Sequence, residues 1–345
     1  MKKVGIFTLY PKEGASSNYR ILMYENDLKN KFEVRSFSFW NKKYVTKYMH
    51  NKKKYIIQIL VLYFYSYLKR IYQVLKYSTN FDTIIIQKSM FPWSNFNFVN
   101  FMKKHKVKII YDIDDAIFLF KGDHSTDIAE KADTIVVGNR IISDHYKKFN
   151  NNVRIFPTVD YSPEYIQYKK NTFGNKIIGW IGSDITINNL EIVESAISEI
   201  IKKYPEVTFR IITNENSKYN FSDKKNFIHV PWNLNTYKLD LSEFTVGIMP
   251  LFDTEDNRGK CAFKLIQYLS MGKPVVASPV GVNVDVVGNS GFLAEYKKDW
   301  INYLERLLFD EKVYNIAVDN IKNEFDKNYN YAIVLDKWIN LINEN

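Results

Sequence analysis

The chain of 345 residues contains a single cysteine, Cys261, which excludes an intramolecular disulfide. A metal site built from several thiolates is excluded as well, and one thiol suits a reducing compartment. The histidines show no metal-ligand spacing, and no G-x-S-x-G or P-loop pattern occurs. The sequence therefore predicts no bound metal and no tightly bound cofactor, and it offers no motif for a hydrolase or a nucleotide triphosphatase.

The sequence also lacks a long apolar run. Its longest, YIIQILVLYFYSYL, has fourteen residues, below the roughly 18 that are needed to span a bilayer. The start, Met1-Lys2-Lys3, leads into an apolar stretch that is too short for a signal peptide and has no cleavage site of small residues. We therefore expect a cytoplasmic protein.

Acidic residues are missing from residues 41–77, which hold nearly the whole excess of the +10 net charge. A basic, aromatic-rich helix of this kind suits the surface of an anionic membrane. Two plainer explanations remain open: a core helix of its domain, or a compositional bias. The aliphatic content is too high for a phosphate groove, and no nucleic-acid module is recognisable. We expect a peripheral protein on the inner face of the membrane and no nucleic-acid partner.

Short apolar segments alternate with helical ones along the chain, which is typical of open parallel sheets covered on both faces. The second half repeats this pattern, and FPTVDYSPEY at the junction has the prolines of a linker. We predict an α/β protein with two doubly wound, Rossmann-like domains, 1–160 and 161–330, and a terminal helix at 331–345. The first domain contains the basic aromatic helix 41–77.

The stretch Val246–Val282 carries the strongest chemical signal. It predicts a buried strand, a charged loop, a helix that ends at Gly272-Lys273-Pro274, and a second buried strand. Arg258, Lys260 and Lys264 lie at the loop-to-helix junction, where backbone N–H groups and the helix dipole favour an anion such as a phosphate. The plainer alternative is a βαβ unit whose loop charges are only solvated.

Two further candidate segments follow predicted strands, where ligands of open α/β sheets bind. Gly14, Ser16 and Ser17 open a helix after the first strand, and small residues let a ligand approach the backbone. This is no G-x-G-x-x-G pattern, and an ordinary turn with a capping serine is the alternative. Asp114 and Asp115 end another strand, where carboxylates in series need a partner such as a cation, ligand hydroxyls or a basic side chain. Surface acids that cap the next segment are the alternative there.

RGKCAFKLIQYLSMGKPVVASPVG resembles the donor-binding segment of GT-B fold glycosyltransferases of the family 4 type. GASSNYRI, IIYDIDDAIF, VRIFPTVD and IIGWIGSD resemble blocks of the same family in the same order. The resemblance implies two Rossmann-like domains that face a cleft, with a C-terminal helix that crosses back to the first domain. It also implies sugar transfer from a nucleotide-diphosphate-sugar donor to a glycan or lipid-linked acceptor. Such a reaction would retain the anomeric configuration without a metal, in bacterial surface polysaccharide or glycoconjugate synthesis.

The resemblance also implies roles for particular residues. Arg258 and Lys264 would stabilise the departing diphosphate, and Asp114 and Asp115 would contact the acceptor near the reacting sugar. The expected donor-binding residues are Gly14, Gly182, Ser183, Thr186, Arg258, Lys260, Lys264 and Gln267. The expected acceptor-side residues are Ser16, Ser17, Arg20 and Lys88.

Three positions depart from the family pattern. Asp114 stands where many family members have a histidine, which puts a histidine-based role in doubt. Gly259 and Gln267 stand where the family has two glutamates, so ribose and sugar hydroxyls would be bound differently. This departure keeps open a catalytically inactive scaffold that binds sugar nucleotides or a membrane surface. A GT-B-like epimerase lacks a clear pair of catalytic acids, and a D-x-D metal site would need the other main glycosyltransferase fold.

Overall fold

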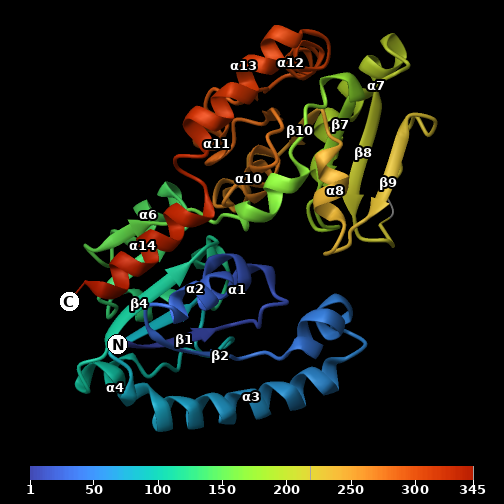
Figure 1. Cartoon of the computed structure of the whole chain (residues 1–345). Coiled ribbons are helices and arrows are strands. Elements are labelled where there is room, and N and C mark those ends of the chain that lie inside the picture. Colours follow the sequence, from blue (N-terminus) through green and yellow to red (C-terminus); the bar gives the residue numbers. More distant parts are fainter. Residues whose placement is uncertain (218, 345) are drawn as a thin grey trace. The chain divides into compact units, whose positions relative to one another are not determined.

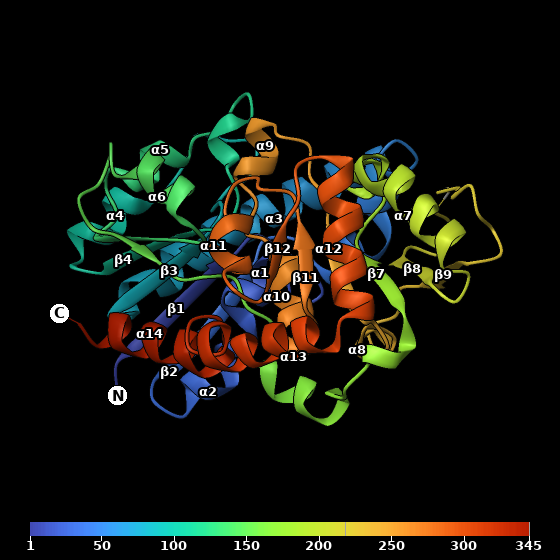
Figure 2. The same cartoon turned by 90° about the horizontal axis from the view of Figure 1, so that it is seen from above.

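The computed structural model describes residues 1–217 and 219–344 and divides into two compact units. Unit 1 comprises Met1–Thr158 together with the described chain from Val334 onward, and unit 2 comprises Val159–Ile333. Each unit contains one six-stranded sheet in which all neighbouring strands are parallel (Figures 1 and 2). The predicted fold class is therefore confirmed.

Unit 1 has the strand order β2-β1-β3-β4-β5-β6. Its strands β3 and β5 are buried along their whole length, as expected for a parallel sheet covered by helices. The strands are β1 Lys3–Thr8, β2 Glu33–Ser38, β3 Thr83–Gln87, β4 Lys108–Ile113, β5 Thr134–Val137 and β6 Val153–Ile155. The helices are α1 Ala15–Arg20, α2 Glu25–Lys29, α3 Ile56–Tyr77, α4 Val99–Lys104, α5 Ser125–Ala129 and α6 Arg140–Tyr146. The last helix of the chain, α14 Tyr331–Asn343, belongs to unit 1 from Val334 onward.

Unit 2 has the strand order β12-β11-β10-β7-β8-β9. Its core includes β7, whose five residues are all buried, and the inner face of α7. The strands are β7 Ile177–Ile181, β8 Thr208–Thr213, β9 Phe227–Pro231, β10 Val246–Met249, β11 Val275–Ala277 and β12 Gly291–Leu293. The helices are α7 Glu191–Lys203, α8 Tyr237–Ser242, α9 Glu255–Arg258, α10 Phe263–Ser270, α11 Asn283–Val287, α12 Lys297–Phe309 and α13 Glu311–Asn320.

Each sheet has one point at which the strand order reverses. In unit 1 the chain places β2 on one side of β1 and β3 on the other, and in unit 2 it places β8 and β10 on opposite sides of β7. Loops leave such neighbouring strands in opposite directions, so a crevice opens at their carboxyl ends. The loops after β1 and β3, and those after β7 and β10, are therefore where ligands are expected to bind.

The basic segment 41–77 is not one helix. Tyr44–Tyr48 form a π-helical turn, Met49–Asn51 form a 3-10 turn, and the continuous helix α3 begins only at Ile56. Tyr55, the residue before α3, has φ −111° and ψ 22°, outside the helical region, which separates these turns from α3.

Helix α14 contacts the N-terminal part of unit 1. Lys2 Nζ donates to the carbonyl of Ile342 at 3.2 Å, and Lys108 Nζ donates to that of Leu341 at 2.8 Å. Lysines at this end of a helix bind its unpaired carbonyls and are favoured by its dipole. The two ends of the described chain therefore meet at the amino ends of β1 and β4.

Candidate active site

In unit 1 the start of α1 is bonded to the ends of β3 and β4. Ser16 Oγ donates to Asp114 Oδ2 at 2.7 Å, and Ser17 Oγ donates to Gln87 Oε1 at 2.7 Å. The N-cap of α1 is Gly14, and a Cβ there would lie 2.3 Å from Tyr10 Cβ, so the tight turn before the helix requires glycine. Both predicted serines thus lie at the crevice of this sheet, each with a partner.

Lys88, directly after β3, joins the two predicted carboxylates. Its amine forms an ion pair with Asp115 and lies 3.6 Å from Asp114 Oδ1. Burial lowers the pKa of Lys88, but Asp114 and Asp115 outweigh it, and the pKa is raised overall. The backbone of Lys88 has φ 65°, a left-handed conformation that costs energy for a residue with a side chain. Such strain is concentrated at functional sites, which supports a role for this strand end.

Asp114 is the most perturbed acid of this group. It is 5% exposed, and its Oδ1 has no hydrogen-bond partner among the described residues. Burial, with a smaller contribution from Asp115, raises the pKa of Asp114 to about 6, while Lys88 and Arg20 act in the opposite direction. A carboxyl group that titrates near neutral pH can exchange a proton with a ligand hydroxyl.

Arg20 does not lie where an acceptor contact is expected. It is 2% exposed, and its guanidinium binds the Asp112 carboxylate and donates to the carbonyl of Phe156 at 2.6 Å. An arginine engaged in this way within the core positions neighbouring elements. We therefore correct the expected role of Arg20 from acceptor contact to a link between α1 and the end of β4.

A pocket of about 390 Å³ lies beside Lys88 in unit 1. Its wall includes exposed aromatic side chains: Trp93 is 67% exposed, Phe96 is 42% exposed and Phe120 is 60% exposed. Tyr10 and Lys88 form part of the same wall. The sequence did not predict this pocket, although its aromatic run between Phe91 and Phe98 was a visible signal.

In unit 2 Lys264 lies over the end of β7. A Cβ on Gly182 would lie 2.5 Å from the Trp180 ring and 2.7 Å from Lys264 Cε, so glycine lets both side chains pack closely against this strand end. The amine lies 5.6 Å from the Trp180 ring centroid, and among the described residues Lys264 has no hydrogen bond or ion pair. Burial lowers the pKa of Lys264 to about 8, and Lys260 adds to this effect. A nearby anion would strongly stabilise the charged form of a buried amine that has no ion pair.

Ser183 and Thr186 follow Gly182 and form a turn. The hydroxyl of Thr186 donates to the carbonyl of Ser183 at 3.1 Å, and Thr186 N donates to the same carbonyl. Ser183 is exposed, so its hydroxyl and backbone remain accessible at the end of β7. The structure thus brings Gly182, Ser183 and Lys264 to one strand end.

The other two predicted cations are already paired. Arg258 binds Asp253 through Nε at 2.5 Å and Nη2 at 2.8 Å, and Lys260 lies 3.0 Å from Asp256. Both pairs are at least partly exposed, and such pairs are worth little in water, so an incoming diphosphate can compete for the cations.

The start of α10 has a strained residue that the sequence did not reveal. Ala262, the N-cap, has φ 53° and is 1% exposed. Its Cβ disfavours this left-handed conformation, so the surrounding structure imposes it. The strain lies two residues from Lys264, at the helix N-terminus where an anion was predicted.

Gln267 is not available to a ligand. It is 6% exposed, and its Nε2 lies 3.2 Å from Asp160 Oδ2. The same oxygen accepts hydrogen bonds from the hydroxyls of Tyr165 and Tyr237. The predicted contact of Gln267 with ribose hydroxyls is therefore corrected: Gln267 belongs to a buried hydrogen-bond cluster around Asp160, all within unit 2. Gly259 ends α9 as its C-cap.

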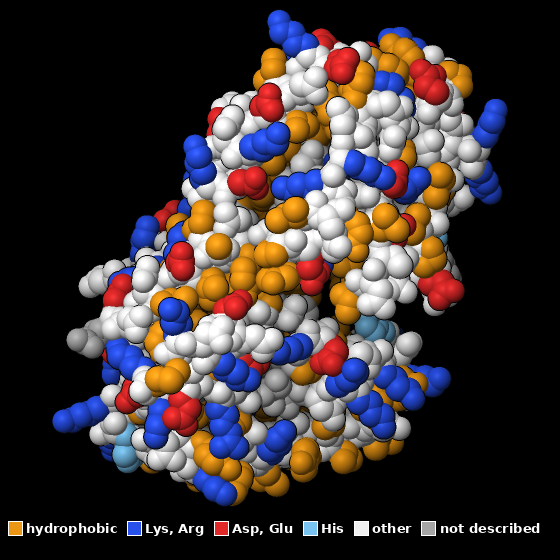
Figure 3. Space-filling view, in the orientation of Figure 1, with side chains coloured by type: hydrophobic (Ala, Val, Ile, Leu, Met, Phe, Trp, Pro, Cys, Tyr) orange, Lys and Arg blue, Asp and Glu red, His pale blue; other side chains and the backbone are white. Residues whose placement is uncertain are grey.

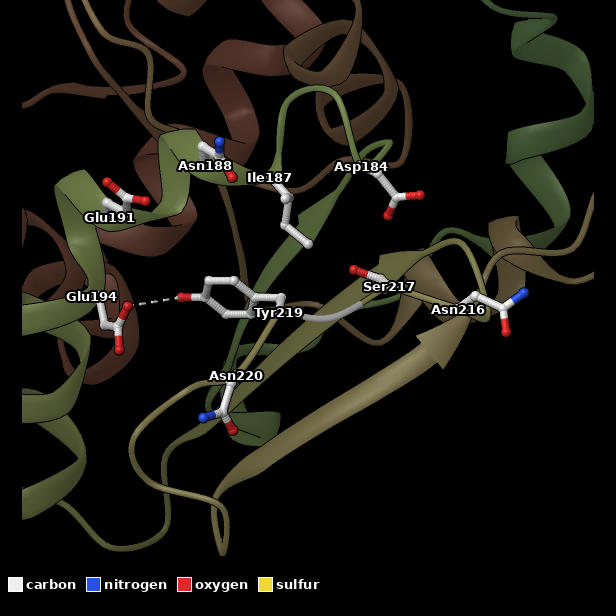
Figure 4. Close-up of a pocket in the computed structure, with 9 residues that line it drawn as sticks. All are labelled: Asp184, Ile187, Asn188, Glu191, Glu194, Asn216, Ser217, Tyr219 and Asn220. Atoms are coloured by element: carbon white, nitrogen blue, oxygen red, sulfur yellow. Dashed lines mark hydrogen bonds between the residues drawn. The ribbon is translucent and has the colours of Figure 1, made fainter. Parts of the chain in front are cut away.

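A second pocket, of about 500 Å³, lies beyond β7 and β8 (Figure 4). Asp184, Glu191 and Glu194 contribute carboxylates to its wall, and the Tyr219 hydroxyl donates to Glu194 at 3.4 Å. Like charges repel, so a diphosphate is disfavoured here. Lys264 is not part of this wall, and the cationic strand end and the larger cavity are different places.

Neither a metal cluster nor a membrane span is found among the described residues. In 1–217 and 219–344 no three His, Cys, Asp or Glu side chains are placed to hold a metal ion. Within the same residues, no helix combines the length and the apolar character needed to cross a bilayer.

Two parallel six-stranded sheets with candidate sites at their reversal points define a protein of GT-B fold. Solved structures agree. Anabaena Alr3699/HepE in complex with UDP and glucose is 12% identical, covers 100% of both chains and has a TM-score of 0.66. S. aureus MnaA with UDP is 13% identical, covers 99% of this chain and 96% of its own, and has a TM-score of 0.60. An α-glucosyltransferase with UDP and DNA is 12% identical, covers 100% of both chains and has a TM-score of 0.63.

The sequence comparison adds a family to the fold. Residues 175–310, within unit 2, match the family model of glycosyl transferases group 1. The resemblance to such glycosyltransferases that the sequence predicted is thereby confirmed for this segment. Among proteins with curated descriptions, none matches the chain.

Proposed function

We propose that this protein is a glycosyltransferase that moves a sugar from a nucleotide-diphosphate-sugar donor to a glycan or lipid-linked acceptor. The observation that carries the proposal is the amine of Lys264 at the end of β7, beside Gly182 and the N-terminus of α10, which forms no hydrogen bond or ion pair with any residue that the structure describes. Negative charge develops on the leaving diphosphate during sugar transfer, and a positioned cation stabilises that charge.

The remaining donor contacts come from the same end of the sheet. Ser183 is exposed and offers its hydroxyl to a phosphate, and Arg258 and Lys260 exchange their carboxylate partners for it. UDP is the first nucleotide to test, because the similar structures of HepE and MnaA were solved with UDP.

The acceptor side of the proposal rests on unit 1. Asp114 has a raised pKa, and its Oδ1 accepts no hydrogen bond from the described residues, so it accepts one from the acceptor hydroxyl, while Lys88 holds Asp115 beside it. The aromatic pocket next to Lys88 offers apolar surface to a sugar face or to a lipid. Three further parts of the proposal come from the family resemblance. They are retention of configuration, a reaction without a metal, and a place in bacterial surface polysaccharide or glycoconjugate synthesis.

Direct binding and turnover measurements test the proposal. Calorimetry with UDP, GDP, ADP and dTDP should show one preferred diphosphate, and Lys264→Ala should weaken its binding. The matching nucleotide sugar should then be consumed faster when a lipid-linked or glycan acceptor is added. If no diphosphate binds above the level seen for the Lys264→Ala variant, the donor site proposed here is wrong.

A second candidate is a protein that binds sugar nucleotides without turnover. Two observations favour it: Gly259 and Gln267 supply no acid at the family glutamate positions, and Gln267 is buried against Asp160. Diphosphate binding without transfer to any acceptor would support this candidate over the enzyme.

A further inference from the structure

The outer face of α3 is apolar, which reverses the usual pattern of a surface helix. The side chains at Ile57, Val61, Phe64 and Leu68 are between 65% and 70% exposed, and Ile56, Leu60, Tyr65, Tyr72 and Leu75 are about half exposed or more. They recur every three or four residues, which places them on one side of the helix. Figure 3 shows hydrophobic side chains along the lower edge of unit 1, where Figure 1 draws α3.

The inner face of α3 is mixed, with the apolar side chains of Ile59 and Val74 buried beside three polar ones. Ser66, Arg70 and Gln73 are buried there, and Arg70 Nη2 donates to the carbonyls of Thr8 at 2.9 Å and Phe37 at 3.2 Å. These bonds fix which side of the helix faces the sheet. The apolar stripe therefore cannot turn inward to join the core.

The exposed stripe continues beyond the helix. Trp93, 67% exposed, stacks on Tyr63 of α3 with ring centroids 5.2 Å apart, and the Tyr63 hydroxyl donates to the carbonyl of Pro92. Exposed apolar patches of this extent mark interaction sites on proteins. Tryptophan and tyrosine are the aromatic residues that favour the boundary between lipid and water.

The positive charge around the outer face of α3 indicates what binds there. No acidic residue occurs in 41–77, and Lys52, Lys53 and Lys54 precede α3, while Lys69 and Lys76 lie exposed along it. A second copy of the chain would bring lysines against lysines, which is unfavourable. An anionic bilayer complements them, and each lysine near such a surface strengthens binding by about fivefold.

We propose that the outer face of α3, together with Trp93, is a membrane-binding surface that lies in the interface of an anionic bilayer. At 22 residues the helix is about 33 Å long and lies flat, as an amphipathic interfacial helix does. This surface extends the proposed function by bringing the acceptor-side pocket to the bilayer that carries a lipid-linked acceptor. Binding to lipid does not itself require sugar transfer.

Sedimentation of the full chain with vesicles tests the surface. The protein should sediment with vesicles of equal parts phosphatidylglycerol and phosphatidylcholine at low salt, and less with phosphatidylcholine alone or at high salt. Ile57→Glu should lower the partition coefficient at least tenfold. Ile166→Glu is the matched control, because Ile166 is an isoleucine of unit 2 with the same 70% exposure, and its partition should stay unchanged.

A second variant keeps the test decisive if Ile57→Glu fails to fold. Replacing Lys52, Lys53 and Lys54 by Gln changes only exposed side chains and should lower binding to the anionic vesicles at least tenfold. Equal recovery in the supernatant with and without vesicles would overturn the proposal. So would a lipid-independent dimer that Ile57→Glu converts to a monomer, since the face would then bind a second copy. Vesicle binding by a chain that shows no transfer would refute only the glycosyltransferase assignment.

Discussion

The guanidinium of Arg20 lies on the carboxylate of Asp112, with Nη2 2.5 Å from Oδ1 and both side chains excluded from solvent. The pair joins the last residue of α1 to the end of β4. Because α1 also carries Ser16 and Ser17, this buried pair fixes the position of the residues that face the proposed acceptor site.

Removal of one partner of the Arg20–Asp112 pair should destabilise the fold. We expect Arg20→Ala to lower the free energy of unfolding by about 3–5 kcal/mol, because a buried carboxylate is left without its cation. Urea denaturation measures the change. Arg154→Ala is the control, since the Arg154–Glu344 pair is exposed and worth about 0–1 kcal/mol. A loss for Arg20→Ala no larger than that of the control would contradict this role.

Substitution of Asp114 should lower the rate of transfer without weakening the binding of the donor nucleotide. Transfer in the wild type is expected to rise as the pH increases through about 6, where the carboxyl group ionises. Asp114→Asn should lower the transfer rate at least tenfold, in line with the loss of a proton-exchanging group. Calorimetry should show UDP affinity unchanged within about twofold, because Asp114 belongs to unit 1. A variant that transfers normally would remove Asp114 from the chemistry.

The same substitution has a predictable effect on the fold. The folded pKa of Asp114 is raised above its unfolded value, so its contribution to stability is lost as the pH rises from about 4 to 6. Asn at this position carries no charge, and we expect the variant to be as stable as the wild type at pH 7 or more stable by on the order of 1 kcal/mol. Thermal denaturation at pH 4.5 and pH 7 measures the effect, which should be smaller at the lower pH.

Lys264 should make diphosphate binding depend on pH. The amine, with a pKa of about 8, is charged below this pH, so affinity should hold near pH 7 and decline as the pH rises above 8. Lys264→Ala should weaken binding by about 1.5–3 kcal/mol, the scale of a hydrogen bond to a charged group, and should remove the decline. Lys264→Arg keeps its charge and should bind equally at pH 7 and pH 9.

Calorimetry at several pH values distinguishes these cases. Lys297→Ala is the control for loss of a lysine in unit 2, because Lys297 is exposed and pairs with Glu199 on another helix. The same pH dependence in the wild type and in Lys264→Arg would show that a different group causes it.

Restoring a glutamate at position 267 should not restore a family-like site. Gln267→Glu places a second carboxylate against Asp160 in the core, and we expect a loss of at least about 2 kcal/mol at pH 7. The loss should shrink at low pH, where the introduced carboxyl group takes up a proton. Gln167→Glu, on an exposed side chain, should have little effect. Tighter UDP binding by Gln267→Glu would show that our placement of this side chain is wrong.

Local patterns were sufficient for the fold and for the candidate strand ends. VGIMPL and IIGWIG are short apolar runs, and they form β10 and β7 next to each other in one parallel sheet. The loops that follow them carry Gly182 and the cations, and the position of these loops at the reversal of strand order follows from the fold class.

Pairings between distant residues were out of reach. Arg20 and Asp112 are 92 positions apart, and Gln267 and Asp160 are 107 apart. Whether a basic or polar side chain is bound by another side chain depends on which strands become neighbours. A single sequence does not reveal that order of strands. The left-handed backbone of Ala262 was equally invisible, since alanine gives no signal of positive φ.

Arg70 connects α3 to the strand that leads to the acceptor-side residues, and this contact bears on their distance from a membrane. It ties α3 to the carbonyl of Thr8, the last residue of β1, and the chain runs from there through Tyr10 to Ser16. If α3 lies on a bilayer, Arg70 and the apolar residues of α3 that pack on the core together set how far the acceptor-side residues stand from the lipid head groups. Acceptors would then be selected by the reach of their head group above the membrane as well as by their chemistry.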